Sequence, residues 1–135
     1  MLKSDENILL IEDDRVDIMT VQRALEKNEI RNPLHVARTG IEALQLLRGE
    51  GGLDRITPAL ILLDLNLPKM SGIEFLHQVR NDPASKDLRI IVLTSSNEPK
   101  DRDAAFAYDV DDYIVKPHSF GEFSRAIATV LALWD

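Results

Sequence analysis

The sequence contains no cysteine, few aromatic residues and no long apolar run. The missing cysteine excludes a disulfide, a thiolate metal ligand and a cysteine nucleophile, and it suits a reducing compartment. The longest apolar run, residues 59–63, is far shorter than the ~20 residues that a membrane-spanning helix needs, and the first residues lack the apolar core of a signal peptide. We therefore expect a cytoplasmic protein with no membrane contact.

Basic residues are also scarce, since 16 Lys and Arg stand against 23 Asp and Glu and give a net charge of −7. No cluster of basic residues forms a stripe that could neutralise a phosphate backbone, so we expect no direct contact with nucleic acid. A chain of 135 residues with 44% apolar and 29% charged residues has the composition of one globular domain.

Short apolar runs alternate with amphipathic stretches along the chain. The runs at 8–11, 59–63, 90–93 and 113–115 are too continuous for half-exposed strands, and 34–37 is a shorter candidate. They predict parallel strands that are covered on both faces. Between them, apolar residues recur at three- or four-residue spacing, which predicts helices. The alternation predicts a doubly wound α/β fold with a five-stranded parallel sheet, because five units are too few to close a barrel.

Capping residues mark the ends of the predicted helices. Thr39-Gly40, Ser71-Gly72 and Ser119 provide N-cap chemistry, and Asn81-Asp82-Pro83 ends the third helix. The fourth helix, at about residues 99–108, is less periodic. The fifth is the clearest, and its apolar stripe consists of Phe120, Phe123, Ile127, Val130, Leu131 and Trp134.

Polar side chains follow four of the predicted strands at the point where each strand ends. They are Glu12, Asp13 and Asp14 after the first, Asp64 after the third, Thr94 and Ser95 after the fourth, and Lys116 after the fifth. Because the carboxyl ends of parallel strands meet at one edge of a sheet, we expect these side chains to share a shallow cleft.

Like charges gather in this predicted cleft. Two carboxylates at ~4 Å repel each other by about 4 kcal/mol at an effective dielectric of ~20, before screening. A hard divalent cation, Mg²⁺ or Mn²⁺, held between Glu12, Asp13 and Asp64 best relieves that repulsion. With Lys116 as a second cation and the Thr94 hydroxyl as a donor, the set suits phosphoryl transfer to a carboxylate, with Asp64 as the nucleophile.

Four segments carry a resemblance to a known family. In this order and spacing, "LLIEDD", "LILLDLNLPKMSG", "IVLTSS" and "DYIVKP" resemble the receiver domain of bacterial two-component response regulators, over about residues 6–133. The resemblance implies a flavodoxin-like strand order, 2-1-3-4-5, and a single receiver domain over residues 1–135 with no attached output domain. It implies a signalling protein that catalyses only its own phosphorylation and dephosphorylation.

The same resemblance assigns the chemical roles. Asp64 would accept a phosphoryl group from a histidine kinase or a histidine phosphotransfer protein. Asp13 would bind Mg²⁺ directly, Glu12 largely through water, and the backbone carbonyl of Asn66 would complete the protein ligands. Asp14 falls where the family is variable, so we expect it to be a neighbour of the site and not a ligand.

The resemblance also implies a switch. Thr94 and Tyr113 match a pair in which the hydroxyl moves toward the phosphoryl group and the aromatic ring turns inward. The peptide bond between Lys116 and Pro117 matches one that is usually cis in the family. Asn66 and Ser96 occupy positions that tune the lifetime of the acyl phosphate.

A narrower similarity is to the small regulators paired with bacterial and cyanobacterial phytochromes. It rests on "LLDLNLPKMSGIEFL", "KDLRIIVLTSSNE" and "YIVKP", and on Trp134 near the end. The similarity implies a phytochrome-type kinase as partner. It also implies a homodimer through the face formed by the fourth and fifth strands and helices, where Trp134 would serve the interface or the core.

Other readings are less consistent with these residues. A haloacid-dehalogenase-type phosphatase needs a second Asp two residues after the nucleophile, where Asn66 stands. A flavodoxin-like FMN carrier needs a first loop without the negative charge of "EDDRVD", and the sequence lacks a P-loop. A module that is never phosphorylated would not need the complete acidic set. His35, His77 and His118 show no metal-ligand spacing and are assigned to structure or surface.

Overall fold

The alternation of strands and helices expected from the sequence is present in the computed structural model, which describes residue 3 and residues 5–132. The strands are β1 (Asn7–Ile11), β2 (Leu34–Ala37), β3 (Pro58–Leu63), β4 (Ile90–Thr94) and β5 (Asp112–Val115). The helices are α1 (Arg15–Lys27), α2 (Gly40–Arg48), α3 (Gly72–Arg80), α4 (Pro99–Ala107) and α5 (Phe120–Ala132).

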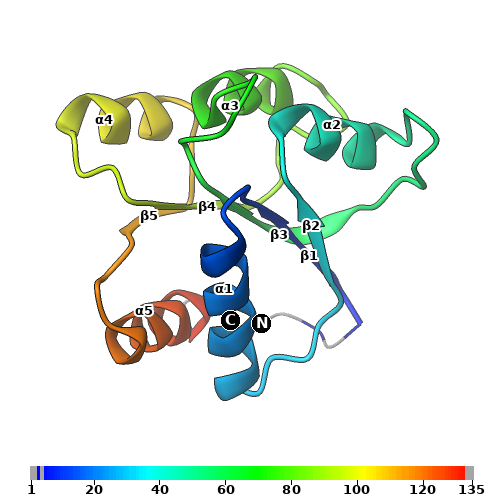
Figure 1. Ribbon diagram of the computed structural model, residues 1–135. Helices are drawn as coiled ribbons and strands as arrows, with labels where there is room; N and C mark the ends of the chain where they lie inside the picture. Colours follow the sequence, from blue (N-terminus) through cyan, green and yellow to red (C-terminus); the bar gives the residue numbers. More distant parts are fainter. Residues whose placement is uncertain (1–2, 4, 133–135) are drawn as a thin grey trace.

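The strands form one parallel sheet in the order β2-β1-β3-β4-β5, as predicted. Helices α1 and α5 cover one face of the sheet, and α2, α3 and α4 cover the other (Figure 1). Alternate side chains of a strand point to opposite faces. Leu9 and Ile11 of β1 therefore pack in the core on the α2–α4 side, while Ile8 and Leu10 pack against α1 and α5. This double coverage explains the continuous apolar runs.

The predicted N-caps are confirmed. Thr39 accepts the Glu42 N–H, Ser71 accepts the Glu74 N–H, and the Ser119 hydroxyl accepts the Glu122 N–H. These caps satisfy backbone donors that have no partner within the helix.

Helix α4 is the exception among the helices. It begins with Pro99 in its first turn, has no side-chain cap and buries only Ala105, which accounts for its weak periodicity. Trp134, which we expected to serve the core or an interface, lies outside the described residues.

The peptide bond between Lys116 and Pro117 is trans, and no cis peptide bond occurs in the part of the chain that the structure describes. The expected cis bond is therefore wrong for this structure. The trans isomer is the lower in energy for an X-Pro bond, by about 0.5–1 kcal/mol.

None of the helices formed by residues 5–132 has both the length and the apolar character that crossing a membrane requires.

Candidate functional site

The ends of β1 and β3 bring three carboxylates together. Ile11 and Leu63 are register partners in these neighbouring strands, and the Asp64 N–H donates to the Ile11 carbonyl at 3.0 Å. Carboxylate oxygens of Glu12, Asp13 and Asp64 consequently lie within 4.8 Å of one another. Glu12 and Asp64 are buried, and Asp13 is exposed. The predicted meeting of these three side chains is confirmed.

Lys116 contributes the ammonium group that contacts this acidic cluster. Its Nζ lies 2.5 Å from Glu12 Oε1, 2.8 Å from Asp17 Oδ2 and 3.4 Å from Asp64 Oδ2. The backbone N–H of Lys116 donates to the Thr94 carbonyl at 2.8 Å, and this bond anchors Lys116 just after β5. The predicted approach of Lys116 to the acidic residues is therefore confirmed.

The pKa shifts follow from burial and from the surplus of negative charge. Burial raises the pKa of Glu12 to about 7, the Asp64 carboxylate adds to the rise, and the hydrogen bond from Lys116 opposes it. Burial alone would lower the pKa of the Lys116 ammonium, but its bonds to Asp17 and Glu12 and the charge of Asp64 raise it. Lys116 therefore stays charged at neutral pH, and the carboxylates still repel one another.

The loop after β3 folds back onto Asp64. The Asn66 N–H donates to Asp64 Oδ1 at 3.1 Å, and the Gly72 N–H donates to the Leu65 carbonyl at 3.0 Å. At Gly72, an added Cβ would lie 2.6 Å from Leu65 Cα and 2.7 Å from the Asp64 carbonyl oxygen. Glycine is required here because the start of α3 approaches the backbone at Asp64 this closely. The Asn66 carbonyl remains a predicted metal ligand.

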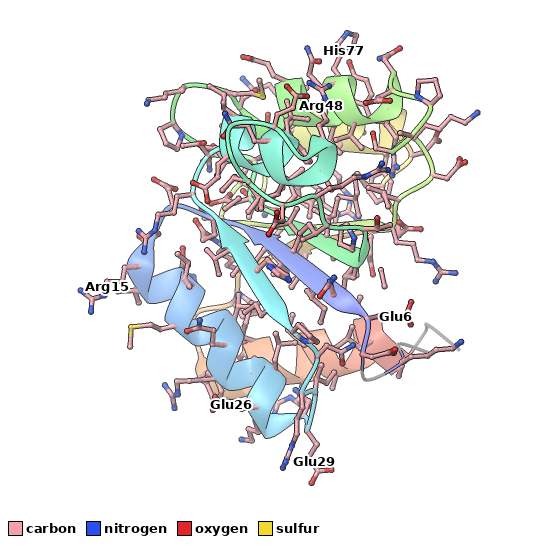
Figure 2. The ribbon with its side chains drawn as sticks, turned by 90° about the vertical axis from the view of Figure 1, so that its right-hand side faces the viewer. Glu6, Arg15, Glu26, Glu29, Arg48 and His77 are labelled. Carbon is pink, nitrogen blue, oxygen red and sulfur yellow. The ribbon has the colours of Figure 1, made fainter. Side chains whose placement is uncertain are left out.

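The residues after β1 place their side chains in three different ways. Asp14 is the N-cap of α1, and its side chain accepts the N–H groups of Val16 and Asp17, so it neighbours the site as expected. Arg15 points away from the protein into solvent (Figure 2). Asp17 lies in the first turn of α1 and turns toward Lys116.

Sequence reasoning missed Asp17, although its place in the first turn of α1, three residues after the Asp14 N-cap, was a usable signal.

The two residues predicted to form a switch, Thr94 and Tyr113, lie near Lys116 and Asp64. Thr94 is fully buried at the end of β4, and its Oγ1 accepts the Ser96 N–H at 3.3 Å. The Tyr113 ring is buried, and its hydroxyl donates to the Ser96 carbonyl at 3.0 Å. The backbone N–H and carbonyl of Ser96 thus connect the two residues of the predicted switch.

A cavity of about 240 Å³ adjoins the acidic cluster between α1 and the β5–α5 loop. Its lining includes Asp17 and Thr20 from α1, and Lys116, His118 and Ser119 from the loop. The cavity reaches the Asp17–Lys116 ion pair from the outside.

The three histidines are not members of the acidic cluster. His35 contacts Asn7 and His77 contacts Tyr108, while His118 is exposed at the cavity. None belongs to the group of possible metal ligands found among the described residues. The contacts of His35 and His77 and the exposure of His118 fit their assignment to structure or surface.

A parallel sheet with a cluster of carboxylates and one lysine at its carboxyl edge defines an α/β domain that can hold a divalent cation beside a strand-end aspartate. More particularly, the chain belongs to the response regulator receiver family, whose family model, "Response regulator receiver domain", matches residues 8–128.

Relatives of known sequence and structure agree with this assignment. The chain is 34% identical over 127 residues to a probable methanogenesis regulatory protein, FilR2 of Methanothrix harundinacea, covering 94% of this chain and 82% of the relative. It is 33% identical over 128 residues to response regulator Rcp1 of Synechocystis sp., covering 94% of this chain and 87% of the relative.

Two solved structures are also similar. The phosphorylated cyanobacterial phytochrome response regulator RcpA is 33% identical with a TM-score of 0.86, and 96% of this chain and 94% of that one are covered. The Mn²⁺-bound form of Rcp1 is 32% identical with a TM-score of 0.84 and the same coverage. The protein is therefore a phospho-accepting signalling protein of the two-component type. Its acidic cluster fits the divalent-metal site of receiver domains.

Proposed function

We propose that Asp64 is the phosphoacceptor of this receiver and that a sensor histidine kinase or a histidine phosphotransfer protein is the donor. The observation that carries the proposal is the position of Asp64. Its carboxylate shares a cluster with Glu12 and Asp13 and lies 3.4 Å from the Lys116 ammonium. A nucleophile between a metal-binding cluster and a fixed cation has what phosphoryl transfer to a carboxylate requires.

The metal in this proposal is Mg²⁺, with Mn²⁺ able to replace it. Glu12, Asp13, Asp64 and the backbone carbonyl of Asn66 would hold the cation. The fit rests on three oxygen-bearing side chains whose ligand atoms lie within 4.8 Å of one another, and on the raised pKa of Glu12, which reflects burial and an excess of negative charge. When bound, the cation neutralises charge on the phosphoryl oxygens.

In the proposed step, a carboxylate oxygen of Asp64 attacks phosphorus, so that a P–O bond forms while the P–N bond to the donor histidine breaks. The imidazole nitrogen keeps the electron pair and takes up a proton. Lys116 and the Thr94 hydroxyl donate to the phosphoryl oxygens. Attack by water later returns the carboxylate and releases phosphate, at a rate that Asn66 and Ser96 tune. The chain catalyses no reaction other than these two.

The readout in this proposal is a shift of the face formed by β4, α4, β5 and α5. Phosphorylation adds about −1.5 to −2 charges at Asp64 and shifts an existing equilibrium of Thr94 and Tyr113. Ser96 supports this route, because it bonds to both switch residues. A homodimer through α4, β5 and α5 is the proposed contact. The exposed ring of Phe106 on α4 supports this face as an interface.

The partner and setting complete the proposal. The similarity to RcpA, a phytochrome response regulator, supports a phytochrome-type kinase as the donor. The family match over residues 8–128 supports one receiver domain over residues 1–135, acting in the cytoplasm.

The proposal is tested by incubating the protein with acetyl phosphate and Mg²⁺ and measuring its intact mass. We expect a single phosphoryl adduct on the wild type and none on Asp64→Asn. Asp14→Asn is the matched control, because Asp14 is an exposed cap that asparagine can replace, and it should carry the adduct. An adduct on Asp64→Asn would overturn the proposal, and steady release of phosphate from many esters would favour a phosphatase.

A further inference from the structure

Asp17 is a carboxylate of the reaction pocket that the proposed function does not use. It comes from α1, whereas the other charged groups of the pocket follow strands. Its Oδ2 lies 2.8 Å from Lys116 Nζ, and the phosphoacceptor Asp64 lies farther from the same nitrogen, at 3.4 Å. Asp17 is also outside the group of carboxylates that could hold a metal.

The hydrogen-bonding capacity of Lys116 is fully used. A lysine ammonium has three N–H donors, and in this structure they face Glu12, Asp17 and Asp64. A phosphoryl group on Asp64 needs one of these donors as a counter-charge. Since Glu12 is also a candidate metal ligand, Asp17 is the carboxylate in this set that bonds to Lys116 and has no other proposed role.

The backbone of α1 fixes Asp17 in place. The Asp17 N–H donates to the N-cap side chain of Asp14 at 3.1 Å, so the first turn of the helix holds the residue. Its side chain is 37% exposed and lines the cavity beside α1. The Asp17–Lys116 pair can therefore open toward solvent without any change in the buried ends of the strands.

We propose that Asp17 is a positioning residue that restrains Lys116 away from Asp64 and thereby slows acceptance of the phosphoryl group. The inference rests on the proposed function of Asp64. Two effects act in the same direction: Asp17 competes for the ammonium, and its charge repels the incoming dianion. Because the pair is partly exposed, the restraint is weak and leaves the reaction possible.

The test compares the rate at which acetyl phosphate and Mg²⁺ modify Asp17→Asn and the wild type, by intact mass at low donor concentration. Asp17→Asn should react about 1.5-fold to fivefold faster, which is the range for a weak, partly exposed ion pair. Damage to the fold would lower the rate of phosphorylation, whereas loss of the restraint would raise it. The direction of the change in rate therefore separates a restraint from a structural role. Asp14→Asn removes a nearby negative charge that does not contact Lys116, and its rate should match the wild type.

Asp17→Glu provides the conservative comparison. The longer side chain still reaches Lys116 and keeps the charge, so its rate should stay near that of the wild type. The proposal is overturned if Asp17→Asn reacts no faster than Asp14→Asn, or if Asp17→Glu reacts as fast as Asp17→Asn. A wild type that gains no adduct at Asp64 would instead overturn the proposed function itself.

Discussion

The charged pocket around Asp64 and the hydrogen-bond network around Tyr113 hold buried polar groups in two different ways. In the pocket, the buried carboxylates of Glu12 and Asp64 share the ammonium of Lys116. In the network, the Thr94 and Tyr113 hydroxyls bond to Ser96. The pocket retains uncompensated charge. The two bonds from Ser96 to Thr94 and Tyr113 join neutral groups, and the charged side chains of Asp101 and Arg102 contact the network from outside.

This difference separates chemistry from readout. Charges in a buried site interact strongly, so the pocket responds to a cation, a proton or a phosphoryl group. A neutral hydrogen bond contributes only about 1 kcal/mol net, so the network can rearrange at small cost. We expect perturbations of the pocket to have larger effects than perturbations of the network.

The largest effect is expected from Lys116→Met. The substitution leaves the Glu12 side chain, which is 2% exposed, without its counter-ion, and breaking a buried pair in this way costs about 3 kcal/mol or more. Urea unfolding without divalent metal should show this loss, and saturating Mg²⁺ should restore part of it. Lys100→Met, at an exposed lysine of α4, should change stability by less than about 0.5 kcal/mol. Equal stability of Lys116→Met and the wild type would remove the contrast between the two regions.

A pH dependence should distinguish the pocket from the network. The folded-state pKa of Glu12, about 7, lies above its ordinary value of 4.5, so the folded protein holds a proton that the unfolded chain releases. Stability from this group is fully present below pH 4.5 and is lost as the pH rises through about 7. The loss is at most about 3–4 kcal/mol, because one pKa unit corresponds to about 1.4 kcal/mol.

Urea unfolding without metal, from about pH 5 to about pH 8, measures this loss. Glu12→Gln should remove this dependence of stability on pH. Mg²⁺ affinity should rise over the same range in the wild type, because the metal binds the deprotonated carboxylate. Stability that rises with pH across this window would contradict the assigned shift.

Gly72→Ala tests whether the backbone at Asp64 needs the close approach of α3. The added Cβ would lie 2.6 Å from Leu65 Cα, so we expect a loss of about 2 kcal/mol in unfolding free energy and slower phosphorylation. Gly121→Ala in α5 is the matched control. The nearest atom to its added Cβ, Arg125 Nη1, is 4.0 Å away, and alanine should stabilise that helix by about 0.5–1 kcal/mol. Normal phosphorylation of Gly72→Ala would show that the pocket tolerates a shift in this loop.

The smallest effect is expected from Tyr113→Phe. The substitution removes the hydrogen bond to the Ser96 carbonyl and should lower stability by about 1 kcal/mol. Phosphorylation of Asp64 should continue, while any phosphorylation-dependent change in dimerisation, measured by sedimentation, should weaken. Tyr108→Phe loses only a contact to His77 at the surface and serves as the control. A strong loss of phosphorylation in Tyr113→Phe would join the two regions into one functional unit.

The fold and the centre of the site could be predicted from the sequence. Continuous apolar runs marked the strands because both faces of the sheet are covered. The meeting of Asp13, Asp64 and Lys116 followed because the carboxyl ends of parallel strands share one edge. Both conclusions depend on periodicity and topology, which local sequence patterns express directly.

The tertiary structure alone decided the finer contacts. Asp17 pairs with Lys116 across 99 residues of chain, Ser96 bonds to both Thr94 and Tyr113, and the bond before Pro117 is trans. Such contacts depend on how α1 and the loops pack against the sheet, to within an ångström. The order of apolar and polar residues therefore determined which groups meet at the edge of the sheet, and only packing decided which of them touch.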